Sequence, residues 1–413
     1  MMLRAFVGAC LLSTSVLVQT ALAGDARSLQ IVVSKSEQTL SLYEDGEIVA
    51  TSRVSSGKPG HQTPSGIFSI LDKRKYHESN IYSAAPMPFM QRLTWSGIAL
   101  HEGRVPNYPA SHGCIRLPAK FAKTLYGMTA RGVHVIVADD PGALRAIDHP
   151  ALLQPRDAPA ADGLMLSDVE LRPASFDASL KLVEVAVNQT TSSVKRKPVA
   201  SKDLAPLRIL ITRRGDRERI MDVQRLLTDL GFDAGVADGY AGTMTVSAVN
   251  GFKRWKDMKT TGPLLTDAFM DALYASAGAE AAPNGQLMVR RNFKPLFEAP
   301  IHIKDPHIAL GTHFFEVINI DQDQGKAEWN GLTLDNHLPT AARKRLGIDV
   351  ADAPGRPNSL SAVLDRLDIP EGIRDRLESE LTTGSSITVS DLSHGLETGE
   401  GTDFVTITKD GPT

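Results

Sequence analysis

Ser111-His112-Gly113-Cys114-Ile115-Arg116-Leu117 is the stretch that decides what this sequence folds into and does, because it surrounds a thiol with groups that can activate it. A cysteine becomes a good nucleophile when a base or a positive charge favours its thiolate. His112 and Arg116 each lie two residues from Cys114, and His101 ends an apolar run thirteen residues upstream. This pattern predicts a catalytic cysteine.

Two other interpretations of these residues stay open. His101, His112 and Cys114 with one water are enough ligands for zinc, and a lone cysteine can be a small buried hydrophobe. In the catalytic interpretation, Gly113 lets the backbone approach a substrate carbonyl, and N–H groups around Gly113 and Cys114 stabilise an oxyanion. Arg116 then holds a carboxylate or lowers the pKa of the thiol.

The first residues predict export. Residues 1–23 carry a positive charge at Arg4, a run of apolar and small residues and the ending Ala21-Leu22-Ala23, which is the pattern of a cleaved signal peptide. Cleavage after Ala23 removes Cys10, so Cys114 is the one thiol left of the two in the sequence. No later run approaches the roughly 18 apolar residues of a membrane helix. We expect a periplasmic protein with no transmembrane segment after signal cleavage.

Length and charge limit the organisation and the partners. A chain of 413 residues is expected to form roughly two to four domains. The formal net charge of -3 and the lack of a basic cluster interleaved with aromatics argue against nucleic acid as a partner. The predicted units are a signal peptide at 1–23, a catalytic domain at 27–140, a Pro/Ala-rich linker at 141–205, a helical domain at 206–279 and a last segment at 285–413.

The apolar periodicity predicts a multidomain fold class. Residues 29–139 read as strands between turns with a short helix at 118–127, which predicts a mainly-β domain. Residues 221–274 have a helical period, which predicts a small all-α module of three helices with Thr245 and Thr266 as caps. The last segment is predicted to be α+β, with strands at 314–320, 332–334, 387–389 and 404–408 and helices at 359–367 and 372–381.

Four stretches within residues 29–138 resemble the catalytic domain of L,D-transpeptidases, the YkuD-type fold. They are Ser55-Ser56-Gly57-Lys58, Thr63-Pro64-Ser65-Gly66-Ile67-Phe68, Gly97-Ile98-Ala99-Leu100-His101 and the heptapeptide around Cys114, in the order of the family. The resemblance implies that Cys114 attacks a peptidoglycan stem peptide between its third residue, a diamino acid, and the terminal D-alanine. D-alanine leaves, and an amine resolves the thioester.

The resemblance also implies the roles of the other site residues. The upstream histidine of the family is the proton acceptor and donor, which gives that role to His101, oriented by the backbone carbonyl of Glu102. His112 helps to shape the site, and Arg116, Ser111 and Glu102 are expected to bind substrate. The family has either asparagine or arginine where this chain has Arg116. No cofactor and no metal are implied.

Residues 221–274 resemble a peptidoglycan-binding domain of the three-helix type. The resemblance rests on Val223-Gln224-Arg225-Leu226-Leu227, Leu230-Gly231, Asp238-Gly239, Gly242, Thr245, Ala248-Val249 and Phe252, with Lys253 where the family usually has glutamine. It implies peptidoglycan as a partner. The alternative is that these residues specify only a fold, since most of them are core or turn positions.

The last segment repeats features of the catalytic domain. Gly66–Ile70, Trp95–Leu100 and Leu125–Asp139 are paralleled by Gly311–Val317, Trp329–Leu334 and Leu377–Asp391, whereas no cysteine follows. The hypothesis is a degenerate copy of the catalytic domain without activity, and the alternative is an unrelated α+β domain. The scattered histidines of this segment match no compact metal-ligand spacing.

The sequence thus predicts an exported L,D-transpeptidase that transfers its acyl group to an amine. The acceptor is a second stem peptide, giving a 3-3 crosslink, or an envelope protein, giving a tether. One alternative is an L,D-carboxypeptidase or crosslink hydrolase, in which water replaces the amine. The other is a non-catalytic wall-binding protein, against which the intact His101, His112, Cys114 and Arg116 argue.

Overall fold

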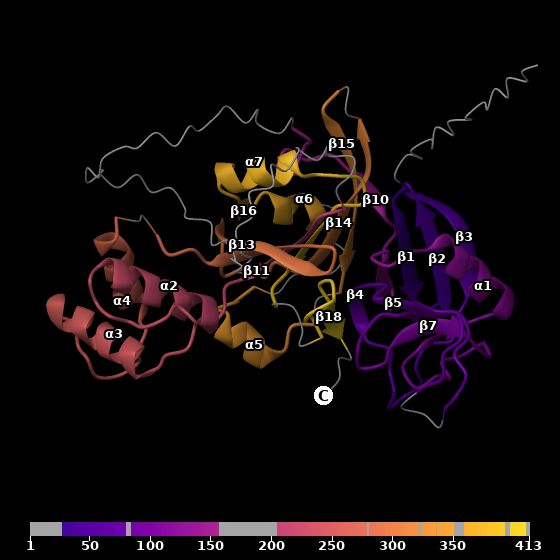
Figure 1. The fold of residues 1–413 in the computed structure, drawn as a ribbon, viewed down its shortest axis with the longest axis horizontal. Helices are drawn as coiled ribbons and strands as arrows, with labels where there is room; N and C mark the ends of the chain where they lie inside the picture. The colour runs from indigo at the N-terminus through magenta and orange to yellow at the C-terminus, as the bar shows by residue number, and fades with distance from the viewer. Residues whose placement is uncertain are drawn as a thin grey trace, which may run out of the picture.

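The computed structural model describes residues 27–79, 84–156, 205–278, 281–321, 324–335, 337–350, 359–392 and 397–409. The predicted signal peptide and residues 157–204 of the predicted linker lie outside these ranges. Figure 1 shows an N-terminal unit beside a C-terminal unit, with a helical module on the far side of the latter. The predicted multidomain class, β-rich with a helical region, is confirmed.

The N-terminal unit is built on a first sheet, and one face of this sheet packs against a helix. Its strands lie in the order β18 (Thr406–Lys409), β4 (Ser65–Ser69), β9 (His134–Ala138), β1 (Leu29–Ser34), β2 (Thr39–Glu44) and β3 (Glu47–Arg53). β1 and β9 are parallel, and the other neighbours are antiparallel. Ala122 and Leu125 of α1 (Ala119–Met128) join the core beneath this sheet.

A small third sheet extends the same core and leads to the heptapeptide around Cys114. Its strands are β5 (Asp72–Arg74), β6 (Met90–Arg92), β7 (Ala99–Glu102) and β8 (Ile115–Leu117), in that order. Leu100 of β7 and Ile115 of β8 are opposite each other in a parallel pair and are fully buried among side chains of the first sheet. Burial of these two residues fixes where the third sheet sits.

The helical module contains α2 (Asp216–Asp229), α3 (Thr243–Trp255) and α4 (Asp267–Ser276), packed around a core that includes Phe252 and Phe269. Thr266 caps α4 as predicted, because its side chain accepts the N–H of Phe269. The prediction that Thr245 caps a helix is wrong, since α3 begins after Gly242. Thr245 is instead buried, and its hydroxyl accepts from Gln224 at 3.0 Å.

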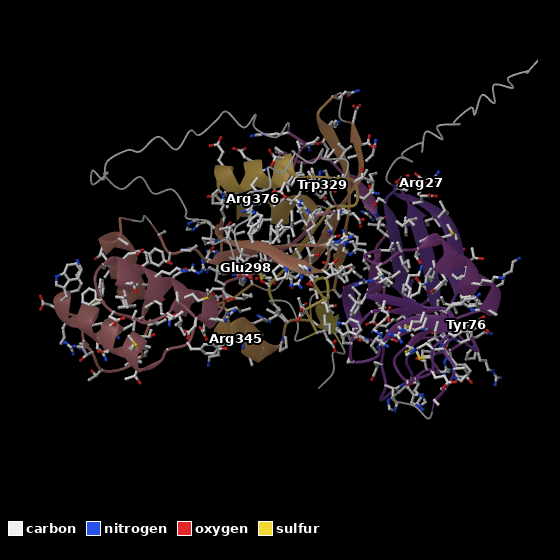
Figure 2. All side chains as sticks on the ribbon, viewed as in Figure 1. Arg27, Tyr76, Glu298, Trp329, Arg345 and Arg376 are labelled. Carbon is white, nitrogen blue, oxygen red and sulfur yellow. The ribbon has the colours of Figure 1, made fainter. Side chains whose placement is uncertain are left out.

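The C-terminal unit is built on a second sheet. Its strands lie in the order β10 (Arg145–Ile147), β15 (Lys326–Leu334), β14 (Thr312–Asp321), β17 (Ser386–Ser390), β11 (Arg208–Arg213), β12 (Gly285–Arg291), β13 (Lys294–Ile303) and β16 (Leu367–Asp368). The helices α5 (Thr340–Arg345), α6 (Ser359–Leu364) and α7 (Glu371–Ser379) belong to the same unit. Trp329 lies in its core, whereas Tyr76 lies on the exposed far side of the N-terminal unit (Figure 2).

Three predicted boundaries differ from the structure. The predicted linker is ordered at its start, because β10 pairs with β15 and Leu152 and Leu153 are buried in the second core. β11, predicted with the helical domain, belongs to the second sheet, so the module is inserted between β11 and β12. β18, predicted with the last segment, completes the first sheet beside β4. Each difference is a strand pairing between residues far apart in sequence, which local periodicity does not encode.

The first and second sheets share strand order and direction. The series β4-β9-β1-β2-β3 and β14-β17-β11-β12-β13 both have antiparallel, parallel, antiparallel and antiparallel neighbours. Helices α1 and α7 precede the equivalent strands β9 and β17. The predicted parallel between Trp95–Leu100 and Trp329–Leu334 fails, because β7 lies in the third sheet whereas β15 lies beside β14.

The two sheets pack against each other through their remaining faces. Ile67 and Ile136 of the first sheet cluster with Phe314 of the second. His134 Nε2 lies 2.9 Å from the Ser386 hydroxyl, at equivalent positions of β9 and β17. The interface is therefore apolar with a few buried polar pairs.

Candidate active site

The parallel pair of β7 and β8 brings His101 and Cys114 to the same side of the third sheet. His101 is opposite Arg116 in the ladder, and Cys114 is two residues before Arg116. Side chains two residues apart on a strand point to the same face. The intervening Leu100 and Ile115 point into the core, so the polar residues face outward toward a cavity.

A hydrogen bond fixes the tautomer of His101. Its Nδ1 lies 2.7 Å from the backbone carbonyl oxygen of Glu102. Because a carbonyl oxygen can only accept, Nδ1 carries the proton and Nε2 of the neutral ring is left as an acceptor. Burial lowers the pKa of His101 to about 4, so the ring is neutral at physiological pH.

Cys114 is held as a thiol. Burial raises the pKa of the Cys114 thiol above its ordinary value, and the N–H of Ala99 and the charges of Arg116 and Arg92 oppose this rise without cancelling it. Its Sγ donates to the Gly97 carbonyl oxygen at 3.4 Å. Attack by this sulfur therefore requires a base to take the proton at the moment of reaction. Arg116 lowers the pKa of the thiol as expected, but burial raises this pKa by more.

The loop before Cys114 is tied down by hydrogen bonds. Ser111 Oγ donates to the Cys114 carbonyl and accepts the N–H of Gly113 at 3.1 Å. Buried Thr63 accepts the N–H of Gly57 at 2.9 Å and donates to the Gly113 carbonyl at 2.7 Å. The Gly113 N–H, predicted as an oxyanion donor, is thus already used within the loop.

These residues open onto a cavity of about 270 Å³. Of the residues predicted from the sequence, His101, Glu102, Ser111, His112, Cys114 and Arg116 line it. His112 is exposed, with its ring centroid 4.8 Å from that of His61. Met87, Met90 and Arg92 from around β6 also line the cavity, and the sequence offered no signal for them.

Two further properties concern the described residues as a whole. Within those residues, His, Cys, Asp and Glu side chains form no group of three that is suited to hold a metal ion. None of the helices in the described ranges combines the length and apolar composition of a membrane span.

Comparison with known proteins finds two family models that match parts of this chain. Residues 28–137 match the YkuD family, the L,D-transpeptidase catalytic domain. Residues 216–264 match the family described as "Putative peptidoglycan binding domain". The curated "Putative L,D-transpeptidase YqjB" of Bacillus subtilis is 27% identical over 148 residues, which cover 31% of this chain and 83% of that protein.

Solved L,D-transpeptidases are about as similar to this chain in sequence as the Bacillus subtilis protein is. The protein from Mycobacterium smegmatis is 26% identical over 27% of this chain and 59% of its own, with a TM-score of 0.26. The L,D-transpeptidase from Stackebrandtia nassauensis is 28% identical over 29% of this chain and 60% of its own, with a TM-score of 0.25. LdtMt1, solved in complex with imipenem, is 26% identical over 27% of this chain and 60% of its own, with a TM-score of 0.26. The chain thus spans about three fifths of these solved relatives.

Proposed function

We propose that this chain is an exported, periplasmic L,D-transpeptidase that works through a thioester on Cys114. The observation that carries the proposal is the shared face of His101 and Cys114, which line one cavity and supply Nε2 as a proton acceptor and a protonated thiol. A match to the YkuD family over residues 28–137 supports the substrate class.

The reaction follows from these groups. Cys114 Sγ attacks the carbonyl between the diamino acid and the terminal D-alanine while His101 Nε2 takes the thiol proton. The C–N bond then breaks, and His101 returns the proton to the departing amino group of D-alanine. An acceptor amine attacks the thioester, passes its proton to His101, and the thiol is restored. We propose the N–H of Cys114 as an oxyanion donor, because the N–H of Gly113 is bound to Ser111.

The helical module and the cavity give the proposal its partners. The module matches a family described as peptidoglycan binding, which supports peptidoglycan as the partner of this chain. Arg116 and Arg92 at the cavity wall suit the carboxylates of a stem peptide. The acceptor is an amine of a second stem peptide or of an envelope protein.

Purified tetrapeptide muropeptides and the full chain test this proposal. The wild type should release D-alanine and form 3-3 linked dimers, and Cys114→Ala and His101→Ala should lose at least about a thousandfold in rate. Retained crosslinking by Cys114→Ala would refute the mechanism. Tripeptide without dimers would indicate a carboxypeptidase instead.

A further inference from the structure

The C-terminal unit can be compared with the N-terminal unit residue by residue. Gln30 and Arg208 occupy equivalent places, because each is paired with the first residue of the strand parallel to it, His134 or Ser386. Counting along the strands from these pairs places Lys35 at the position of Arg213. The equivalence of the two units is therefore defined by strand pairing and not by sequence similarity.

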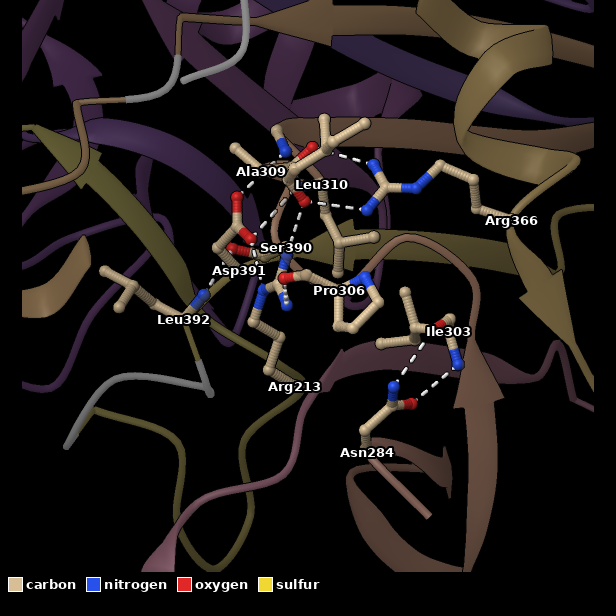
Figure 3. A network of polar contacts seen from close by, with 12 residues as sticks. Arg213, Asn284, Ile303, Pro306, Ala309, Leu310, Arg366, Ser390, Asp391 and Leu392 are labelled. Carbon is tan, nitrogen blue, oxygen red and sulfur yellow. Dashed lines mark hydrogen bonds and ion pairs between the residues drawn. The ribbon is translucent and has the colours of Figure 1, made fainter. Parts of the chain in front are cut away.

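An ion pair recurs at equivalent positions. Lys35 Nζ lies 3.2 Å from Asp139 Oδ1, joining the ends of β1 and β9. Arg213 Nε lies 2.7 Å from Asp391 Oδ1, joining the ends of β11 and β17 (Figure 3). Asp391 follows β17 as Asp139 follows β9. The first pair is partly exposed and the second is buried. A matching fold with an ion pair at matching positions is nevertheless unexpected for unrelated domains.

The two units differ in two places, which are the stretch that contains Cys114 in the N-terminal unit and the hairpin connection that contains the helical module in the C-terminal unit. The strands of the third sheet lie between β4 and α1, whereas the equivalent stretch between β14 and α7 contains β15, α5, α6 and β16 and no cysteine. The connection Ser36-Glu37 of the first hairpin corresponds to residues 214–284 in the second, which contain the helical module. The N–H of Arg214 donates to the Asn284 carbonyl oxygen at 3.0 Å, which holds the first and last residues of this stretch together.

We infer that residues 207–391 are a non-catalytic second copy of the L,D-transpeptidase fold, and that this copy is a carrier that holds the module at a fixed place relative to Cys114. The apolar interface between the sheets supports a fixed placement, since Ile67 and Ile136 pack on Phe314. The inference rests on the proposed function, because it takes the occupant of the module to be the peptidoglycan strand.

Module excision tests the copy. Residues 214–284 are replaced by Ser-Glu, the connection of the equivalent hairpin. The variant should fold with a Tm within a few degrees of the wild type, be acylated by imipenem at Cys114 at the same rate, and no longer bind sacculi. Unfolding of the variant would count against the copy. In the matched variants, Arg213→Lys should fold as the wild type does and Arg213→Ala should lower the Tm, and equal loss in both would overturn the copy.

Flexible linkers test the carrier role. Gly-Ser linkers of ten residues are inserted after Arg213 and before Gly285, which keeps the module but frees it. Sacculus binding and imipenem acylation should be unchanged, while crosslinking of sacculi should fall at least fivefold. Unchanged crosslinking would overturn the carrier role. Failure of the wild type to bind sacculi or to crosslink would instead refute the proposed function.

Glu397 makes an independent contact with the active site. Its Oε2 accepts the N–H of Trp95 at 3.1 Å and that of Ser96 at 3.4 Å. These residues form a turn with Gly97, whose N–H donates to Thr94 O and whose carbonyl accepts the thiol of Cys114. One carboxylate from the segment before β18 therefore holds the turn that orients the nucleophile.

We propose that Glu397 is a positioning residue for Cys114. Glu397→Ala should lower the rate of acylation by imipenem about tenfold and shift the pH profile of alkylation by iodoacetamide, with little change in Tm. Glu397→Gln, which keeps an acceptor oxygen, should stay within threefold of the wild type. Exposed Glu400→Ala is the matched control. An unaltered rate in Glu397→Ala, or a loss that glutamine does not rescue, would overturn the role.

Discussion

His101 sets the pH at which the site can work. Burial lowers the pKa of His101 to about 4, so the ring is neutral, and Nε2 can accept a proton, at any pH above that value. The acylation rate by imipenem should therefore rise as pH passes through about 4 and not near 6.5. Mass spectrometry of acylated protein between pH 3.5 and 8, with folding followed by circular dichroism, measures this. An acid limb near pH 6.5 would mean that His101 is solvated in solution.

Thr63 connects the family motif to the nucleophile loop. Thr63→Val keeps the shape but removes both hydrogen bonds, leaving the Gly57 N–H and the Gly113 carbonyl buried and unpaired. An unsatisfied buried group costs about 1–3 kcal/mol, so acylation should fall at least about tenfold and the Tm should drop. Thr124→Val, at an exposed hydroxyl of α1, should change neither. Equal acylation rates in the two variants would show that Thr63 does not orient the loop.

The residues of the candidate site are easier to locate from the sequence than the contacts that hold them in place. His101, Glu102, Ser111, His112, Cys114 and Arg116 fall on two short stretches, and one parallel strand pair brings them to one cavity. Thr63 stood in a matched motif without an assigned role. Glu397 had no signal, because its contact spans about 300 residues and a lone glutamate in a turn-rich segment has no periodicity.

At the scale of elements, β18 shows what a distant strand contributes. Thr406 and Ile407 pair with β4, and Val405 is fully buried in the core of the N-terminal unit. A Cβ on Gly66 would lie 2.1 Å from the Thr406 carbonyl oxygen. Gly66→Ala should therefore displace β18, at a cost of about 1–3 kcal/mol as for other overpacked positions.

Denaturant unfolding with acylation as a second readout checks this prediction. Gly127→Ala is the matched control, because a Cβ there meets nothing within 4 Å and alanine is favoured over glycine in a helix by about 0.5–1 kcal/mol. Gly66→Ala should lower the midpoint and Gly127→Ala should not. Equal midpoints in Gly66→Ala and the wild type would show that β18 contributes nothing to the first sheet in solution.

At the scale of the whole molecule, the module and the sheets were predictable to different degrees. Apolar periodicity located α2, α3 and α4 because a helix carries its pattern within one stretch. The second sheet has β11 and β12 on either side of the module and β10 far upstream, so its composition required the structure. The repeat of strand order was hinted at by Leu125–Asp139 and Leu377–Asp391, whereas the tryptophan parallel was coincidental.

Glu316 makes the interface between the sheets pH-dependent. It is buried, accepts from Ser28 at 3.0 Å, and burial raises its pKa to about 7 from 4.5, with Arg208 opposing the rise. The carboxyl of Glu316 ionises near pH 4.5 in the unfolded chain and near pH 7 in the folded one. The free energy of unfolding therefore falls as pH rises between these values, by about 3 kcal/mol in all.

Glu316→Gln should remove this loss, with unfolding free energies equal to the wild type near pH 4 and higher at pH 8. Urea unfolding at both pH values measures this difference, with Glu298→Gln as the control because Glu298 is an exposed residue of β13. Buried His134 titrates in the opposite direction, since burial lowers its pKa, and it contributes equally to both proteins. The same pH slope in Glu316→Gln and the wild type would mean that the sheets admit water at this contact.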